Sequence, residues 1–232
     1  MDQDTKKALI KYLATYITQN KLQKIEQVLP WRTRYVTVVL EDIYQSQNAS
    51  AVLRTCESFG IQDVHIIENH NMFKINREVT QGAQKWLTIL RYNQPGEDNT
   101  KLCLQQLKTQ QYRLIATTPD KKALPISKLN LEGKMALMFG NEESGLSQVA
   151  LELADTRVCI PMYGFTQSFN ISVSVAIVLS NLIARLHHSK INWRLSESEA
   201  LDLKLHWIKT ILKRGQKADK LIQQFLTEMT NR

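Results

Sequence analysis

Three short stretches of this sequence place polar side chains and glycines directly after a run of apolar or β-branched residues. They are residues 47–55, 138–147 and 160–176. Each run is a predicted strand. In open α/β sheets, ligands bind where the carboxyl ends of parallel strands meet. The three stretches are therefore candidates for the walls of one shared site.

The first stretch contains an asparagine and an arginine on a predicted helix. Asn48 is well placed as the N-cap of that helix. The apolar residues form one stripe, and Arg54 lies nearly opposite it, on the same side as Ser50 and Glu57. On its own, such an arginine is most simply a solvated surface residue. Near the carboxyl end of a strand, its guanidinium is also suited to grip phosphate or ribose oxygens.

Within the second stretch, residues 140–147 have the glycine spacing of a phosphate-binding loop but not its chemistry. Leu146 occupies the lysine position, and Glu142 with its neighbouring glutamate would repel phosphate, which excludes that loop. Gly140 permits close backbone approach to a ligand, and Ser147 can cap the next helix. An ordinary strand–turn–helix connection explains these residues equally well.

The third stretch runs from a strand ending at a proline, through a polar loop, into a helix of small and β-branched residues. A buried core helix accounts for the apolar face of the predicted helix 171–187. It does not account for Gln167, Ser168 and Asn170 immediately before it. They place side-chain amides, a hydroxyl and free backbone N–H groups at one helix start. Taken alone, this loop indicates a small-molecule site at the edge of a sheet.

In this order and spacing, the three stretches resemble the three motifs of the SPOUT superfamily of RNA methyltransferases. They look most like its TrmH branch, which methylates ribose 2′-hydroxyls, and the resemblance covers roughly residues 34–186. It implies an α/β, mostly parallel sheet with a C-terminal trefoil knot. It also implies S-adenosylmethionine as the methyl donor, no metal, and a homodimer. Phe169 departs from the pattern, because members commonly have leucine there.

The resemblance further implies roles for the matching residues. Arg54 is the candidate for activating the ribose hydroxyl. Because a guanidinium stays protonated at neutral pH, stabilising the alkoxide or orienting the phosphate is preferred to general-base action. The implied catalytic set is Arg54, Asn48, Glu142, Ser168 and Asn170. The residues expected to line the donor pocket are Thr117, Gly140, Ile160, Met162 and Phe169.

The elements that must position these residues alternate along the chain. Predicted strands are residues 36–40, 64–67, 87–90, 114–118, 136–139 and 157–160. Predicted helices are residues 49–59, 100–109, 148–154 and 171–187. Such alternation predicts a mostly parallel sheet with helices on both faces.

The net charge of +8 is unevenly distributed. Residues 1–34 carry seven Lys and Arg against three acids, residues 186–232 carry nine against five, and the centre carries fourteen of each. A charge run is often only a solvated face, but two basic ends on a neutral centre suggest arms that hold a polyanion. Composition does not distinguish nucleic acid from an acidic membrane. Candidate RNA-binding residues are Lys7, Lys11, Lys209, Lys213 and Lys217.

The expected organisation is a basic helical N-terminal arm (1–34), a methyltransferase domain (35–187) and a basic helical C-terminal arm (188–232). The three cysteines show no metal-ligand spacing and are interpreted as reduced thiols. No apolar signal core or membrane-spanning stretch is apparent. A cytoplasmic protein without a membrane partner is expected.

The short helical arms favour tRNA as the methyl acceptor. Within the family, they resemble the arms of the enzyme that methylates the ribose of guanosine 18 in the tRNA D-loop. Members acting on ribosomal RNA usually carry a globular N-terminal domain, which this chain replaces with about 34 residues. An rRNA methyltransferase and a non-catalytic RNA-binding protein with this fold are the alternatives. A membrane-surface role for the arms is a more distant one.

Overall fold

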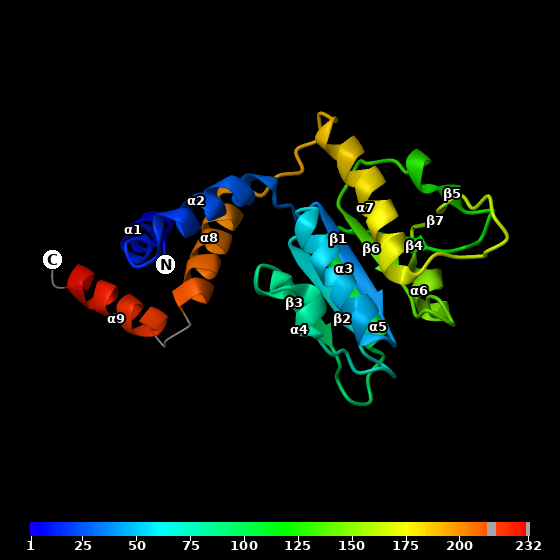
Figure 1. Cartoon of the computed structure of the whole chain (residues 1–232), viewed down its shortest axis with the longest axis horizontal. Coiled ribbons are helices and arrows are strands. Elements are labelled where there is room, and N and C mark those ends of the chain that lie inside the picture. Colours follow the sequence, from blue (N-terminus) through cyan, green and yellow to red (C-terminus); the bar gives the residue numbers. More distant parts are fainter. Residues whose placement is uncertain (213–216, 231–232) are drawn as a thin grey trace. The chain divides into compact units, whose positions relative to one another are not determined.

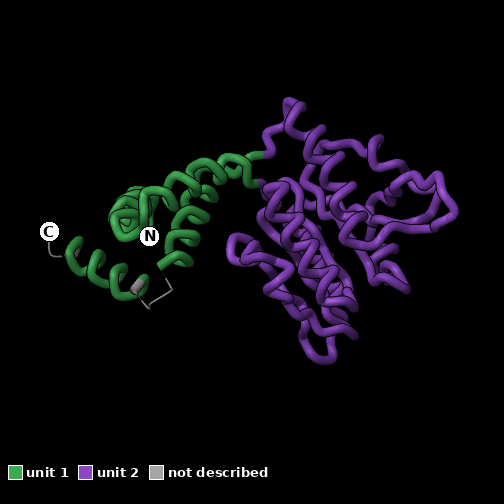
Figure 2. Tube along the Cα trace, in the orientation of Figure 1, with its two compact units in different colours: residues 1–32, 194–232 green, residues 33–193 purple. Residues whose placement is uncertain are grey.

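The computed structural model describes residues 1–212 and 217–230, and the chain forms two compact units. Unit 1 combines both ends of the chain, residues 1–32 and 194–232, and unit 2 comprises residues 33–193 (Figure 2). Both basic ends of the sequence therefore contribute to one unit. Within the described residues, no helix has the length and apolar character needed to cross a membrane.

Unit 2 is built on a seven-stranded sheet in the order β3-β2-β1-β6-β4-β7-β5 (Figure 1). Every neighbouring pair of strands is parallel. The strands are β1 (Val36–Glu41), β2 (Asp63–Ile67), β3 (Thr88–Tyr92), β4 (Arg113–Thr117), β5 (Leu124–Pro125), β6 (Met135–Phe139) and β7 (Thr156–Cys159). The predicted parallel sheet is confirmed. Strand β5 was not predicted, because two residues are too few to show a pattern. The expected trefoil knot stays a prediction.

Helices cover both faces of this sheet, as predicted. On one side, α3 (Ser46–Ser58) packs against α7 (Ile171–His187) and the short α4 (Arg77–Thr80). On the other side, α5 (Asn99–Thr109) packs against α6 (Gln148–Leu153).

Strand β1 shows why both faces need cover. All six of its residues are buried, as expected for a central strand of a parallel sheet. Alternate side chains serve different cores: Val38 and Leu40 pack with the α3 and α7 residues, and Val39 packs with the α5 residues. The same strand ends in Glu41, a buried carboxylate.

Unit 1 is helical. It contains α1 (Gln3–Ala14), α2 (Gln19–Val28), the 3-10 turn η1 (Leu29–Trp31), α8 (Glu197–Leu212) and α9 (Lys217–Thr230). The buried Trp207 ring lies 5.6 Å from the Arg32 guanidinium carbon. Ion pairs join the N-terminal helices to α8: Lys6–Asp202, Lys7–Glu197 at 2.7 Å and Lys204–Glu26 at 3.1 Å. Helical pairing of the two chain ends thus neutralises part of their charge.

Candidate active site

A pocket of about 700 Å³ lies at the carboxyl ends of β4, β6 and β7. The five residues expected to hold a methyl donor all line it: Thr117, Gly140, Ile160, Met162 and Phe169. Four of the five expected catalytic residues line it too: Asn48, Glu142, Ser168 and Asn170. The three stretches that the sequence separates by many residues therefore form one cavity.

The loop between β6 and α6 forms one wall because it folds back on itself. Asn141 and Gly145 exchange two backbone hydrogen bonds of 3.0 Å. A Cβ atom on Gly140 would lie only 2.1 Å from the Gly145 carbonyl carbon. Gly140 is therefore required by the loop itself, a tighter constraint than the ligand approach inferred from sequence. Ser147 ends the loop and, as predicted, caps α6 by accepting from the Ala150 N–H.

Hydrogen bonds between side chains join the three loops. Asn48 Nδ2 donates to Glu142 Oε1 over 2.8 Å, and Asn170 Nδ2 donates to Asn48 Oδ1 over 3.0 Å. Asn170 also accepts from the Ser172 N–H and so caps α7. One chain of hydrogen bonds thus runs from the β6–α6 loop, through α3, to the start of α7.

The expectation that Asn48 caps α3 is wrong. The helix begins at Ser46, three residues earlier than predicted, and its N-cap Gln45 makes no side-chain capping bond. Glu142 from the β6–α6 loop instead accepts from the N–H groups of Tyr44 and Gln45, at 3.1 and 3.4 Å. A carboxylate at a helix start is favoured by the helix dipole. The charge comes from a distant segment, so local sequence could not reveal it.

Glu142 carries its negative charge in this site. Burial raises the pKa of its carboxyl group, but hydrogen bonds from Asn48 and from the backbone of Tyr44 and Gln45 outweigh burial. The pKa of Glu142 consequently lies below its ordinary value. The pocket wall is anionic at neutral pH.

Sequence reasoning missed a second carboxylate that shapes the pocket. Glu41, at the buried end of β1, accepts from Ser147 N–H at 2.9 Å and from Ser147 Oγ at 2.7 Å. The Thr100 hydroxyl also donates to it, over 2.5 Å. Glu41 therefore fastens the β6–α6 loop to the central strand. The available signal was an acid closing an otherwise apolar strand.

The lining suits a nucleoside with a charged tail. Its volume lies within the roughly 300–1,000 Å³ typical of small-molecule sites. Apolar Phe139, Leu146 and Val178 contribute to it alongside the amides and the Glu142 carboxylate. An anionic wall also suits a sulfonium cation. Among the described residues, no group of three or more His, Cys, Asp or Glu side chains is arranged to hold a metal.

Arg54 is the one expected catalytic residue that this pocket does not include. Its side chain is exposed on α3, and no hydrogen bond or ion pair of that side chain is described. Ala51, one helical turn earlier, lines a different groove of about 670 Å³ between α3 and α7. Val173 contributes to that groove and is 43% exposed. The fold within one chain thus separates Arg54 from the other motif residues.

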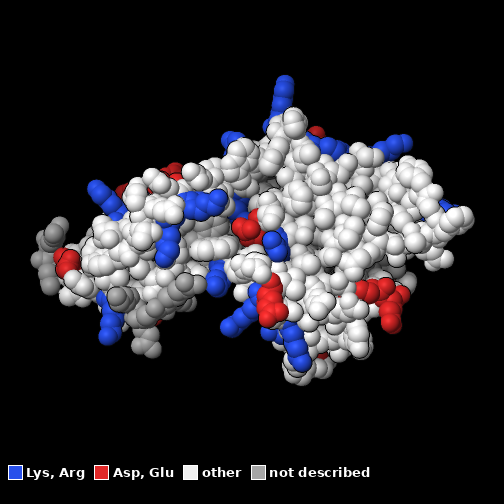
Figure 3. Space-filling view, viewed as in Figure 1, with Lys and Arg blue, Asp and Glu red and all other residues white. Residues whose placement is uncertain are grey.

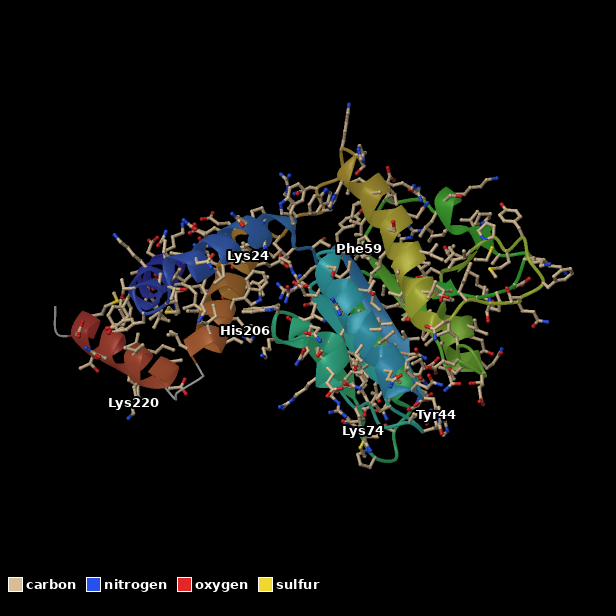
Figure 4. All side chains as sticks on the ribbon, viewed as in Figure 1. Lys24, Tyr44, Phe59, Lys74, His206 and Lys220 are labelled. Atoms are coloured by element: carbon tan, nitrogen blue, oxygen red, sulfur yellow. The ribbon has the colours of Figure 1, made fainter. Side chains whose placement is uncertain are left out.

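The five lysines expected to bind RNA have different surroundings. Lys7 pairs with Glu197, Lys11 is exposed on α1, and Lys209 is half-buried on α8. Lys213 lies outside the described residues, and Lys217 begins α9, where its side chain is not described. Lys and Arg side chains are spread over unit 1 on the face that Figure 3 shows. They include other exposed lysines, such as Lys24 on α2 and Lys220 on α9 (Figure 4).

A parallel α/β sheet with a pocket between the loops after β1, β6 and β7 is the arrangement expected of the methyltransferases that the three motifs resemble. The chain belongs to the SpoU rRNA Methylase family, whose model matches residues 35–180. The resemblance drawn from the three motifs is confirmed. The chain is 44% identical over 222 residues to the tRNA (guanosine(18)-2'-O)-methyltransferase of Borreliella burgdorferi, covering 96% of this chain and 99% of that protein.

Other similar proteins belong to the same group of tRNA-modifying enzymes. The enzyme of the same name from Thermus thermophilus is 32% identical, over 70% of this chain and 81% of that protein. Among solved structures, the TrmH/SpoU tRNA modifying enzyme of A. aeolicus superposes with a TM-score of 0.73 at 28% identity. That superposition covers 82% of this chain and 95% of the other.

Proposed function

We propose that this protein transfers a methyl group from S-adenosylmethionine to the ribose 2′-hydroxyl of guanosine 18 in tRNA. The observation that carries the proposal is the convergence on one pocket of nine of the ten residues expected for donor binding and catalysis. Near full-length similarity to the Borreliella burgdorferi enzyme supports the choice of acceptor. The cytoplasm is the proposed compartment, because tRNA is the proposed acceptor.

The pocket residues would bind and orient the donor. S-adenosylmethionine supplies a methyl group already activated by its sulfonium, so the hydroxyl oxygen forms the new C–O bond as the C–S bond breaks. Thr117, Gly140, Ile160, Met162 and Phe169 would hold the donor. Glu142 and Asn48 keep the loops in place through their hydrogen bond. The main task of this chain is alignment of the oxygen with the methyl carbon and sulfur.

Arg54 would act from a second copy of the chain. The pocket of its own chain does not include it, and two neighbours on the same helix, Ala51 and Thr55, line the α3–α7 groove. We propose a homodimer that packs along this groove and brings Arg54 to the pocket of the other subunit. There the guanidinium would stabilise the developing alkoxide or orient the RNA phosphate, while the hydroxyl proton leaves to solvent.

Nucleoside mapping tests the proposed reaction. The protein is incubated with tRNA and methyl-labelled S-adenosylmethionine, and the RNA is digested to nucleosides. Label in 2′-O-methylguanosine is expected, and it should disappear when guanosine 18 of the transcript is replaced by adenosine. Label that persists in the replaced transcript, or that enters only ribosomal RNA, contradicts the proposed acceptor.

A further inference from the structure

The loop between β2 and α4, residues 68–76, is held by buried and half-buried polar groups. The Asp42 carboxylate accepts from the N–H groups of Asn69 and His70 at 2.8 Å and of Asn71 at 3.1 Å. Asp42 itself has a φ of +50°, a conformation that non-glycine residues rarely adopt. This left-handed turn directly follows β1, and the Asp42 carboxylate at that turn holds the loop through three backbone N–H groups.

Two further anchors hold the rest of the loop. Glu68 is buried, accepts from the Phe73 N–H at 2.7 Å, and forms a bidentate pair with Arg91 at 2.7 Å for both bonds. The Asn76 N–H donates to the buried Ser50 hydroxyl on α3 over 2.8 Å. A loop tied at both ends and in the middle presents its outward side chains in a defined arrangement.

Those outward side chains are cationic, aromatic or apolar. Met72 is 72% exposed. Lys74 and Arg77 are exposed as well, and neither forms an ion pair within the part of the chain that the structure describes. Tyr44, on the adjoining β1–α3 connection, is also 72% exposed. Residues 69–77 contain no acidic side chain. We call Tyr44, His70, Met72, Lys74 and Arg77 the β2–α4 face.

This face adjoins the candidate pocket. The β1–α3 connection separates the two: Tyr44 belongs to the face, while the next residue, Gln45, lines the pocket. Tyr44 and Lys74 lie at the same end of α3, opposite Phe59 (Figure 4). On the surface that Figure 3 shows, Lys and Arg side chains lie over β3 and α4 together with acidic side chains.

We propose that the β2–α4 face binds the unpaired nucleotides that flank the methylated one. Lys74 and Arg77 would contact phosphates, and the Tyr44 ring would stack on a base. Unpaired RNA is typically held by this combination of cations along the backbone and aromatic rings against bases. The inference rests on the proposed function for the identity of the RNA, but the binding step does not need turnover.

The test compares matched variants by equilibrium binding to an RNA stem-loop over a range of salt concentrations. Lys74→Ala/Arg77→Ala should lower the slope of log affinity against log salt by about 0.7 for each phosphate that the variant no longer neutralises. Lys101→Ala/Lys128→Ala removes two exposed charges from other elements and should leave the slope unchanged. Tyr44→Ala should weaken binding about fivefold or more, whereas Tyr44→Phe should bind normally. Calorimetry should show the same S-adenosylmethionine affinity in every variant.

The results separate RNA binding by the β2–α4 face from the proposed methylation reaction. Unchanged RNA affinity and salt slope in the Lys74/Arg77 variant, or an equal decrease in the control, overturn the inference. Altered oligomeric state with unchanged RNA affinity shows instead an interface between copies, which also overturns it. If stem-loop binding depends on the β2–α4 face but the protein does not methylate tRNA in the nucleoside-mapping assay, the inference is supported and the proposed function is refuted. A wild-type chain that binds no RNA refutes both.

Discussion

Asn48 Nδ2 lies 2.8 Å from Glu142 Oε1, and this hydrogen bond joins residues 94 positions apart in the chain. Asn48 also accepts from Asn170 through its other amide atom. Its amide thus donates to one motif and accepts from another, which an ionised carboxylate at this position cannot do. The pocket depends on this residue for its geometry.

Asn48→Asp should therefore damage the site more than a simple removal of the side chain. The new carboxylate would face the Glu142 carboxylate instead of donating to it. Loss of a hydrogen bond to a charged group costs about 1.5–3 kcal/mol, so donor affinity should fall by about tenfold or more. Calorimetry with S-adenosylmethionine measures this. Gln47→Glu, an exposed neighbour with the same charge change, is the control; equal effects in both variants would show a general charge effect instead.

Glu41→Gln should loosen the β6–α6 loop. The amide keeps the shape of the carboxylate but loses charge and one acceptor atom, while Ser147 N–H, Ser147 Oγ and the Thr100 hydroxyl all need acceptors. We expect a decrease of about 1–3 kcal/mol in the free energy of unfolding, together with weaker donor binding. Denaturant titration and calorimetry measure the two effects. Glu97→Gln at an exposed acid is the control, and wild-type behaviour of Glu41→Gln would remove its positioning role.

Arg54→Ala should lower turnover without changing donor affinity or oligomeric state. The side chain is exposed and does not line the pocket, so donor affinity and oligomeric state should stay normal. Turnover should fall by about 100-fold or more, as when one electrostatic group is removed from a transition state. Single-turnover kinetics measure the change. Near-normal turnover would make Arg54 an ordinary solvated residue.

Mixing two impaired variants, at a donor concentration too low to saturate Asn48→Asp, tests whether Arg54 acts across subunits. Arg54→Ala retains an intact pocket, and Asn48→Asp retains its arginine. If Arg54 serves the other subunit, mixed dimers should regain about a quarter to a half of wild-type activity, since one of their two sites is complete. Each variant mixed with itself is the control. Absence of any regained activity in verified mixed dimers would place Arg54 in the site of its own chain.

The association itself is tested at the α3–α7 groove. Val173 lines that groove and is 43% exposed, so Val173→Asp would place a charge in the proposed interface. The variant should sediment as a monomer and lose turnover while its unfolding free energy changes little. Leu124→Asp adds the same charge at another exposed apolar residue, on β5, and serves as the control. A Val173→Asp protein that stays dimeric would exclude this groove as the interface.

His65 gives the fold a defined acid sensitivity. Burial lowers its pKa from 6.5 to about 4, so between these pH values the unfolded chain binds a proton that the folded chain excludes. Stability from this group is complete above pH 6.5 and falls as pH drops toward 4, by about 3 kcal/mol in all. Denaturant unfolding of His65→Asn at several pH values should show a smaller decrease. His188→Asn at an exposed histidine is the control; identical pH profiles for His65→Asn and wild type would refute the assignment.

The alternation of apolar runs was enough to predict a parallel sheet, because buried strands in such sheets must be apolar on both faces. β1 and α7 were predicted almost residue for residue. α4 and β5 were missed, since elements of four and two residues carry no periodic signal. The start of α3 was misplaced because Glu142, 94 residues from Asn48, supplies charge at that helix start.

The sequence by itself determined the family, the parallel sheet and the residue types at three strand ends, because motif spacing and apolar periodicity are local properties of the chain. The tertiary structure decided which residues meet. It brought Asn48, Glu142 and Asn170 into one hydrogen-bonded chain, revealed Glu41 as a buried anchor, and left Arg54 outside the pocket. Contacts of this kind depend on how strands far apart in sequence pair side by side, and no local pattern records that pairing.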